Sequence, residues 1–149
     1  MDTLAASVRR LHPGLPVWHC EQYIERIIAL EEWRGMIPGE RAGCRTAPLF
    51  LVAAIGNPKR FHRDVEMLGV EIRGARFFRD HTCLRPGDWD ACIRAAVAVG
   101  AEALLITEKD AIKNTGNHEF PIFVAIQSTR IAEQAELEHR LSVLIKRCH

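Results

Sequence analysis

Residues 49–58 read Leu-Phe-Leu-Val-Ala-Ala-Ile-Gly-Asn-Pro, and they carry the clearest structural signal in the chain. The first seven form a continuous apolar run, which is typical of a strand buried on both faces of a parallel sheet. Gly56 interrupts the run. Asn57 followed by Pro58 is typical of the N-cap and first position of a helix, where proline's missing N–H costs nothing. The stretch therefore predicts a strand that turns tightly into a helix.

The same alternation of strand and helix continues along the chain. Apolar runs predict further strands over residues 70–75, 103–106 and 121–126, and helical spacing predicts helices over residues 59–68, 89–97 and 131–146. Asp88 is the expected N-cap of the second of these helices, and Gly100 its C′ residue. This alternation predicts an α/β fold, a Rossmann-like three-layer sandwich with a mostly parallel sheet of about four strands.

The first 47 residues follow a different pattern. Residues 4–11 predict a short helix and residues 16–20 a short strand, whereas residues 23–33 fit either a helical stripe or strand alternation. Residues 35–47 are expected to form a linker or loop. We therefore predict an N-terminal arm and connection over 1–47 and a C-terminal α/β domain over 48–149.

The composition argues against several classes of protein. The 149 residues carry a formal net charge of +1, with lysine and arginine dispersed, so nothing favours binding to nucleic acid. The five cysteines are irregularly spaced and form no CxxC, so we expect reduced thiols in the cytoplasm rather than a disulfide framework, and no metal site. No signal peptide is expected, and no apolar run approaches the roughly 20 residues that span a bilayer.

Three loops follow predicted strands, and the carboxyl ends of parallel strands meet at one edge of a sheet, where such folds bind ligands. The first contains Gly56 and Asn57, at a helix N-terminus that favours anions, although a capped helix with nothing bound explains it equally well. The third loop begins at Thr107, which forms a capping box with Asp110. Capping leaves Glu108 and Lys109 unexplained, and a functional and a structural role are equally compatible with them.

The second loop contains Asp80 and His81. A histidine at a sheet edge takes up or orients a proton near neutral pH, and a neighbouring carboxylate orients its ring. The alternative is that Asp80 caps a local turn and His81 is merely exposed. The dipeptide by itself favours this alternative, so its interpretation depends on the loops around it.

Taken together, the three loops resemble the C-terminal domain of the tetraacyldisaccharide 4′-kinase family, the lipid A 4′-kinases. The resemblance rests on three motifs, in this order: Ile55-Gly56-Asn57-Pro58-x-x-Phe61, Asp80-His81, and Thr107-Glu108-Lys109-Asp110-Ala111-x-Lys113. It covers residues 47–126 most strongly. One departure is Leu84, which stands where many relatives carry an aromatic residue.

The resemblance implies an enzyme at the inner membrane that moves the γ-phosphate of ATP, with Mg²⁺, onto the 4′ hydroxyl of a tetraacylated glucosamine disaccharide. In such enzymes the N-terminal domain supplies the phosphate-binding loop, the magnesium site and the catalytic aspartate, and the histidine of the Asp-His motif supports that aspartate. It thus implies catalytic roles for His81 and Asp80. Gly56, Asn57, Glu108 and Lys109 remain candidates for cofactor binding.

The chain contains no GxxxxGK[ST] sequence, the phosphate-binding loop of many nucleotide-binding enzymes. We therefore expect it to be inactive alone, as a truncated product, a relic, or a subunit that works with a separately encoded P-loop half. The expected location is the cytoplasm, with peripheral attachment to the inner membrane through such a partner. The alternative is a non-catalytic α/β module that binds a phosphate or nucleotide or mediates an interaction.

Overall fold

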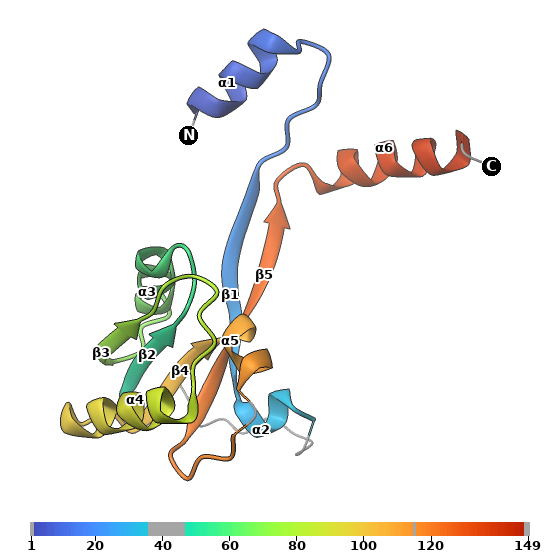
Figure 1. The fold of residues 1–149 in the computed structure, drawn as a ribbon. Helices are drawn as coiled ribbons and strands as arrows, with labels where there is room; N and C mark the ends of the chain where they lie inside the picture. The colour runs from blue at the N-terminus through green and yellow to red at the C-terminus, as the bar shows by residue number, and fades with distance from the viewer. Residues whose placement is uncertain (1, 36–46, 115, 148–149) are drawn as a thin grey trace. The chain divides into compact units, whose positions relative to one another are not determined.

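The computed structural model describes residues 2–35, 47–114 and 116–147 (Figure 1). The strands are β1 (Cys20–Ala29), β2 (Leu49–Ala53), β3 (Ile72–Phe77), β4 (Ala103–Thr107) and β5 (Ile122–Ile131). The helices are α1 (Asp2–Leu11), α2 (Leu30–Trp33), α3 (Pro58–Glu66), α4 (Pro86–Ala98), α5 (Glu108–Lys113) and α6 (Gln134–Arg147). The linker predicted over 35–47 lies almost entirely outside the described residues.

The described strands form one sheet in the order β1-β5-β4-β2-β3. β2 pairs in parallel with both β3 and β4, and β4 pairs in parallel with β5. The predicted α/β class with a mostly parallel sheet is therefore confirmed. The sheet has a fifth strand because the ambiguous residues 23–33 form the end of β1 and then α2, and β1 lies beside β5 at the edge of the sheet.

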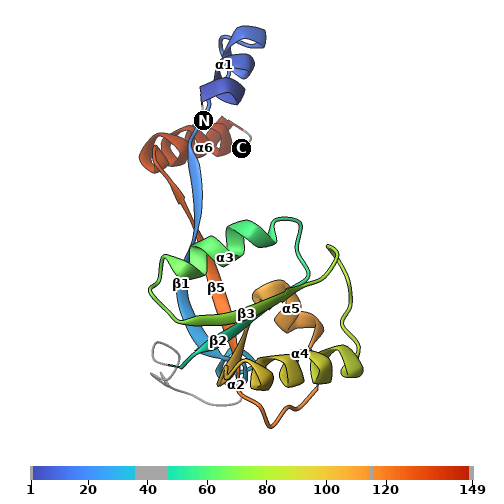
Figure 2. The ribbon, with the colours of Figure 1, turned by 90° about the vertical axis from the view of Figure 1, so that its left-hand side faces the viewer.

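Helices cover both faces of β2, which explains why its sequence is apolar without a break. Successive side chains of a strand point to opposite faces. The odd-numbered residues of β2 pack against Phe61 and Val65 of α3, and the even-numbered ones against Trp89 and Cys92 of α4. Figure 2 shows α3 and α4 on opposite sides of β2 and β3. Every residue of β2 is consequently buried.

The helix ends follow the sequence signals with one exception. The Asn57 side chain accepts the N–H of Arg60 at 3.1 Å and caps α3, as predicted. Gly100 follows α4 with a φ of 72°, which glycine adopts without steric cost. The prediction of Asp88 as the N-cap of α4 was wrong. The helix begins at Pro86, and the Asp88 carboxylate, in its first turn, accepts the N–H of the capping residue Arg85 at 2.8 Å.

The chain divides into two compact units, residues 1–23 with 129–149 and residues 24–128. In the first unit the Glu133 carboxylate accepts the backbone N–H of His19 at 3.1 Å. The final helix begins at Gln134 rather than at residue 131, because β5 continues to Ile131 and the N–H of Ala132 still bonds the carbonyl of His19. No described helix is long and apolar enough to cross a membrane. The boundary at residue 47 stays a prediction.

Candidate functional site

The three loops singled out in the sequence leave the same edge of the sheet. They follow β2, β3 and β4, which are neighbours and run in parallel. The helix after β2, α3, packs on one face of the sheet, and the helix after β4, α5, contributes Ala111 to the core on the other face. Adjacent strands whose helices leave to opposite faces create the crevice where open α/β sheets bind ligands. In this sheet the helices change faces between the ends of β2 and β4.

The first two loops touch at Gly56 and Asp80. A Cβ atom built on Gly56 would lie 3.1 Å from Oδ2 of Asp80, closer than ordinary van der Waals contact. Glycine therefore allows the loop after β2 to lie directly against the carboxylate of the loop after β3. Asn57, the next residue, uses its side chain to cap α3.

Asp80 and His81 form a local turn with unusual backbone geometry. His81 has a φ of 63°, a left-handed conformation that is uncommon for residues other than glycine. Oδ1 of Asp80 accepts the backbone N–H of His81 at 3.0 Å, and the Thr82 hydroxyl donates to the carbonyl of Arg79 at 2.6 Å. This left-handed residue brings two adjacent side chains to the same side of the turn.

The imidazole of His81 points into solvent, with 84% of the side chain exposed. Its Nε2 lies 3.7 Å from Oδ2 of Asp80, which is within ion-pair range but too long for a hydrogen bond. Asp80 thus fixes the backbone of His81 by a hydrogen bond, and its carboxylate lies beside the ring. The imidazole is accessible to another molecule or domain.

In the third loop, the side chains of Glu108 and Lys109 differ in their contacts. Oε2 of Glu108 accepts the backbone N–H of Gln127 at 2.9 Å, just beyond the last paired residues of β4 and β5. Glu108 therefore has a structural role, because its carboxylate extends the hydrogen bonding between these strands. Lys109 is exposed, and its ammonium group makes no hydrogen bond or ion pair with the part of the chain that the structure describes.

Asp110 is the most deeply buried charged residue among those described, at 1% exposure. Its N–H is accepted by Oγ1 of Thr107 at 3.3 Å, as a capping box predicts. The reciprocal bond of that motif is absent here. Instead Oδ2 accepts the Thr107 hydroxyl at 2.7 Å and the backbone N–H of Ala54, at the end of β2, at 3.3 Å. Oδ1 has no partner among the described residues.

A second polar cluster, which the sequence did not reveal, surrounds the buried side chain of Asn114 at the end of α5. Its Oδ1 accepts the N–H of Gly116 at 3.1 Å and faces Nε2 of His118, also at 3.1 Å. Arg34 donates to the carbonyls of Asn114 and Gly116. Because Oδ1 only accepts, Nε2 of His118 is the donor. These residues are isolated polar positions in the sequence, without a recognisable spacing.

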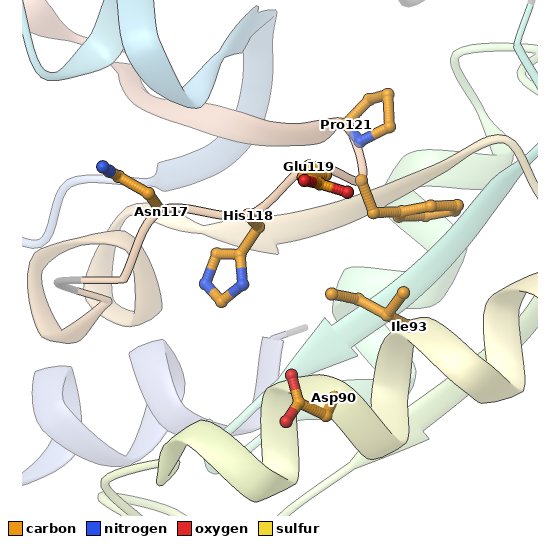
Figure 3. Close-up of a pocket in the computed structure, with 7 residues that line it drawn as sticks. Asp90, Ile93, Asn117, His118, Glu119 and Pro121 are labelled. Atoms are coloured by element: carbon orange, nitrogen blue, oxygen red, sulfur yellow. The ribbon is translucent and has the colours of Figure 1, made fainter.

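His118 also borders the hollow shown in Figure 3. Burial, and then the positive charge of Arg34, lower the pKa of His118 from its usual value, while Asp90 acts in the opposite direction. The hollow has a volume of about 470 Å³ and is lined by Asp90, Ile93, Asn117, His118, Glu119, Phe120 and Pro121. It lies just before β5 begins, whereas the three loops follow strand ends. The hollow and the loops are therefore separate features.

Comparison with known proteins shows that the chain is similar to tetraacyldisaccharide 4′-kinases. A family model described as tetraacyldisaccharide-1-P 4′-kinase (LpxK) matches residues 10–146. The tetraacyldisaccharide 4′-kinase of Xanthobacter autotrophicus is 31% identical over 123 residues, which are 79% of this chain and 36% of that protein. The enzyme of that name from Methylorubrum extorquens is 34% identical over 95 residues, 64% of this chain and 29% of that protein.

A solved structure shares the fold. It is the "apo" form of LpxK from Aquifex aeolicus in complex with ATP, with a TM-score of 0.54 and 16% identity. The similarity covers 93% of this chain and 40% of that one. The chain thus spans well under half the length of the relatives that it matches.

Proposed function

This chain belongs to the tetraacyldisaccharide 4′-kinase family, and on that premise we propose that it supplies the C-terminal part of a lipid A 4′-kinase. The complete enzyme transfers the γ-phosphate of ATP to the 4′ hydroxyl of a tetraacylated glucosamine disaccharide. The observation that carries the proposal is the family match over residues 10–146, which includes all three loops at the sheet edge. We expect no turnover by this chain alone.

ATP and Mg²⁺ are the proposed cofactors of the complete enzyme. The residues described here do not fit them. No three His, Cys, Asp or Glu side chains among the described residues group closely enough to hold a metal ion. The sequence also contains no phosphate-binding loop, whose backbone N–H groups and lysine cradle phosphates. We therefore assign the nucleotide and metal to a second, P-loop-bearing half.

His81 is the proposed catalytic residue on this side of the active site. Its exposed imidazole is available to contact and orient the catalytic carboxylate of the P-loop half. Asp80 orients His81 through the backbone bond and the nearby charge. Phosphoryl transfer depends mostly on positioning and electrostatic stabilisation, so an orienting pair of this kind suits the reaction.

The four other candidate residues differ in the contacts that they make. Gly56 leaves room for Asp80, and Asn57 and Glu108 are engaged in hydrogen bonds with the backbone. Lys109 is the candidate whose charge is free among the described residues to meet a phosphate of the substrate or nucleotide.

Reconstitution tests this proposal. The 149-residue chain is mixed with a P-loop-bearing N-terminal half from a relative such as the Xanthobacter autotrophicus kinase. Transfer of radioactive phosphate from ATP to tetraacyldisaccharide 1-phosphate is then measured. We expect turnover only in the mixture, and His81→Ala to lower it by about tenfold or more. His62→Ala, which alters a histidine on α3 outside the three loops, serves as the matched control and should leave turnover unchanged.

An inactive mixture, or a His81→Ala variant as active as the original, would refute the kinase role. The alternative function is a non-catalytic module that holds a phosphate or nucleotide, and the α3 N-terminus directly after β2 favours it. Calorimetry of the isolated chain with nucleotides and sugar phosphates separates the two, because tight binding without a partner supports the alternative.

A cytoplasmic location with peripheral attachment to the inner membrane is proposed for the kinase.

A further inference from the structure

We infer that Asp110 is a positioning residue for the proposed catalytic pair Asp80–His81, and that it acts through the peptide group between Ala53 and Ala54. The catalytic meaning of this inference rests on the proposed function. The physical linkage does not depend on that function.

One peptide group joins two of the three loops. Its N–H, on Ala54, donates to Oδ2 of Asp110 at 3.3 Å. Its carbonyl, on Ala53, accepts the N–H of Phe78 at 2.9 Å. Phe78 is the first residue after β3 and lies two positions before Asp80. The orientation of this single peptide plane therefore couples the position of Asp110 to the start of the Asp80–His81 turn.

The linkage is a continuous chain of hydrogen bonds. The Thr107 hydroxyl donates to Asp110 at 2.7 Å, Asp110 accepts from the Ala53–Ala54 peptide, and that peptide accepts from Phe78. The two bonds on either side of the Ala53–Ala54 peptide run head to tail and polarise one another, and a low local dielectric strengthens them. Ala53, Ala54, Thr107 and Asp110 are all buried, so water does not compete for these groups.

The arrangement places a charged side chain where open α/β sheets commonly receive a ligand. Oδ1 of Asp110 is buried and unpartnered among the described residues, so the carboxylate is kept at a cost in free energy. A helix cap alone does not require that cost, because Thr107 already caps α5. In addition to any part in capping, the carboxylate therefore holds the ends of β2 and β3 in a fixed geometry.

The test uses substitutions that separate the hydrogen bonds from the charge. Asp110→Ala removes both bonds at Oδ2. Asp110→Asn keeps an oxygen that accepts from Thr107 and Ala54, although its buried amide nitrogen lowers stability. Asn114→Ala is the matched control, because Asn114 is a buried polar residue of the same segment whose side-chain partners lie outside the three loops.

In the reconstituted kinase, Asp110→Ala should lower kcat by about tenfold or more with KM unchanged within about threefold, since small displacements of a catalytic group are costly. Asp110→Asn should retain at least about a third of kcat despite its lower melting temperature. Asn114→Ala should retain the original kcat. If Asp110→Ala loses no more kcat than Asn114→Ala, or if Asp110→Asn loses as much as Asp110→Ala, the positioning role is wrong.

Backbone NMR of the isolated full chain tests the linkage without any activity. Asp110→Ala should shift the amide resonances of Phe78, Asp80 and His81, and leave those of His118 in place, whereas Asp110→Asn should shift the first three much less. Unmoved resonances at Phe78–His81 overturn the inference. Should Asp110→Ala fail to fold, Thr107→Val takes its place, because it removes one bond to Oδ2, together with the α5 cap, and predicts smaller shifts at the same residues. An inactive wild-type mixture refutes the kinase proposal, while the NMR result still decides the linkage.

Discussion

Gly56 lies so close to Asp80 that a methyl group on its Cα would sit 3.1 Å from the Asp80 carboxylate. Two loops separated by more than 20 residues in the sequence are therefore in direct contact at one edge of the sheet. The contact explains why a residue without a side chain stands at this point.

Gly56→Ala should disturb the proposed site more than it disturbs the fold. The added Cβ presses on Oδ2 of Asp80, but that side chain is 44% exposed and has room to rotate away. We expect the free energy of unfolding to change by no more than about 1 kcal/mol. Activity in the reconstituted kinase should fall severalfold. Gly87→Ala, where a Cβ would meet no atom within 4 Å, is the control for adding a methyl group. Equal activity of the two variants would contradict the prediction.

His81→Gly should be more stable than His81→Ala, although both lose the imidazole. The φ of 63° at His81 is costly for alanine and free of strain for glycine. The side chain is 84% exposed, so little packing is lost in either variant. We expect a difference of about 1 kcal/mol in the free energy of unfolding, measured by urea denaturation, with both variants equally low in reconstituted activity. A more stable alanine variant would show that the turn is not strained.

Acid should destabilise the chain partly through His118. Burial, and then Arg34, lower its pKa in the folded state, so the unfolded chain binds the proton more readily. Neutral His118 makes its full contribution to stability above the unfolded-state pKa of about 6.5. That contribution is lost as the pH falls through the folded-state pKa. Urea denaturation at pH 7.5 and pH 5 should show a smaller loss for His118→Gln, which keeps a donor for Asn114, than for the original chain. An identical loss in both would contradict the assignment.

The thiols of Cys83 and Cys92 should react very differently. Cys83 is exposed two residues after His81, whereas Cys92 is fully buried and burial raises its pKa to about 11. At pH 8 an alkylating reagent should label Cys83 in the folded chain and Cys92 only after unfolding, as measured by peptide mass spectrometry. Labelling of Cys83 with a bulky reagent should also lower reconstituted activity, and Cys83→Ser should abolish that effect. Rapid labelling of Cys92 in the folded chain would contradict the buried position.

Local sequence signals predicted local structure well in residues 48–149. The apolar run of β2, the Asn57 cap and the Gly100 terminator each depend on neighbouring residues alone, and each is present as expected. The error at Asp88 had a local cause too, because aspartate is favoured both as an N-cap and in the first turn of a helix. The N-cap of α4 is Arg85, and Pro86 takes the first helical position.

Structure that depends on contacts with residues distant in the sequence could not be predicted from local patterns. Residues 23–29 became a strand because β5 offers an edge to pair with, and the same pairing extends β5 to Ile131 at the expense of the final helix. The role of Glu108 cannot be predicted from neighbouring residues, because its partner, the N–H of Gln127, is 19 residues away. No periodicity in a sequence records such a bond.

The sequence by itself determined the α/β class, the three loops and the family, because strand and helix periodicity and short motifs are properties of neighbouring residues. Only the tertiary structure decided what the residues of those loops do. It joined Asp110 to Ala54 and Gly56 to Asp80, assigned Glu108 to the sheet, and left His81 exposed. The physical reason is that hydrogen bonds and contacts between parallel strands connect residues tens of positions apart, and their geometry exists only after the sheet has formed.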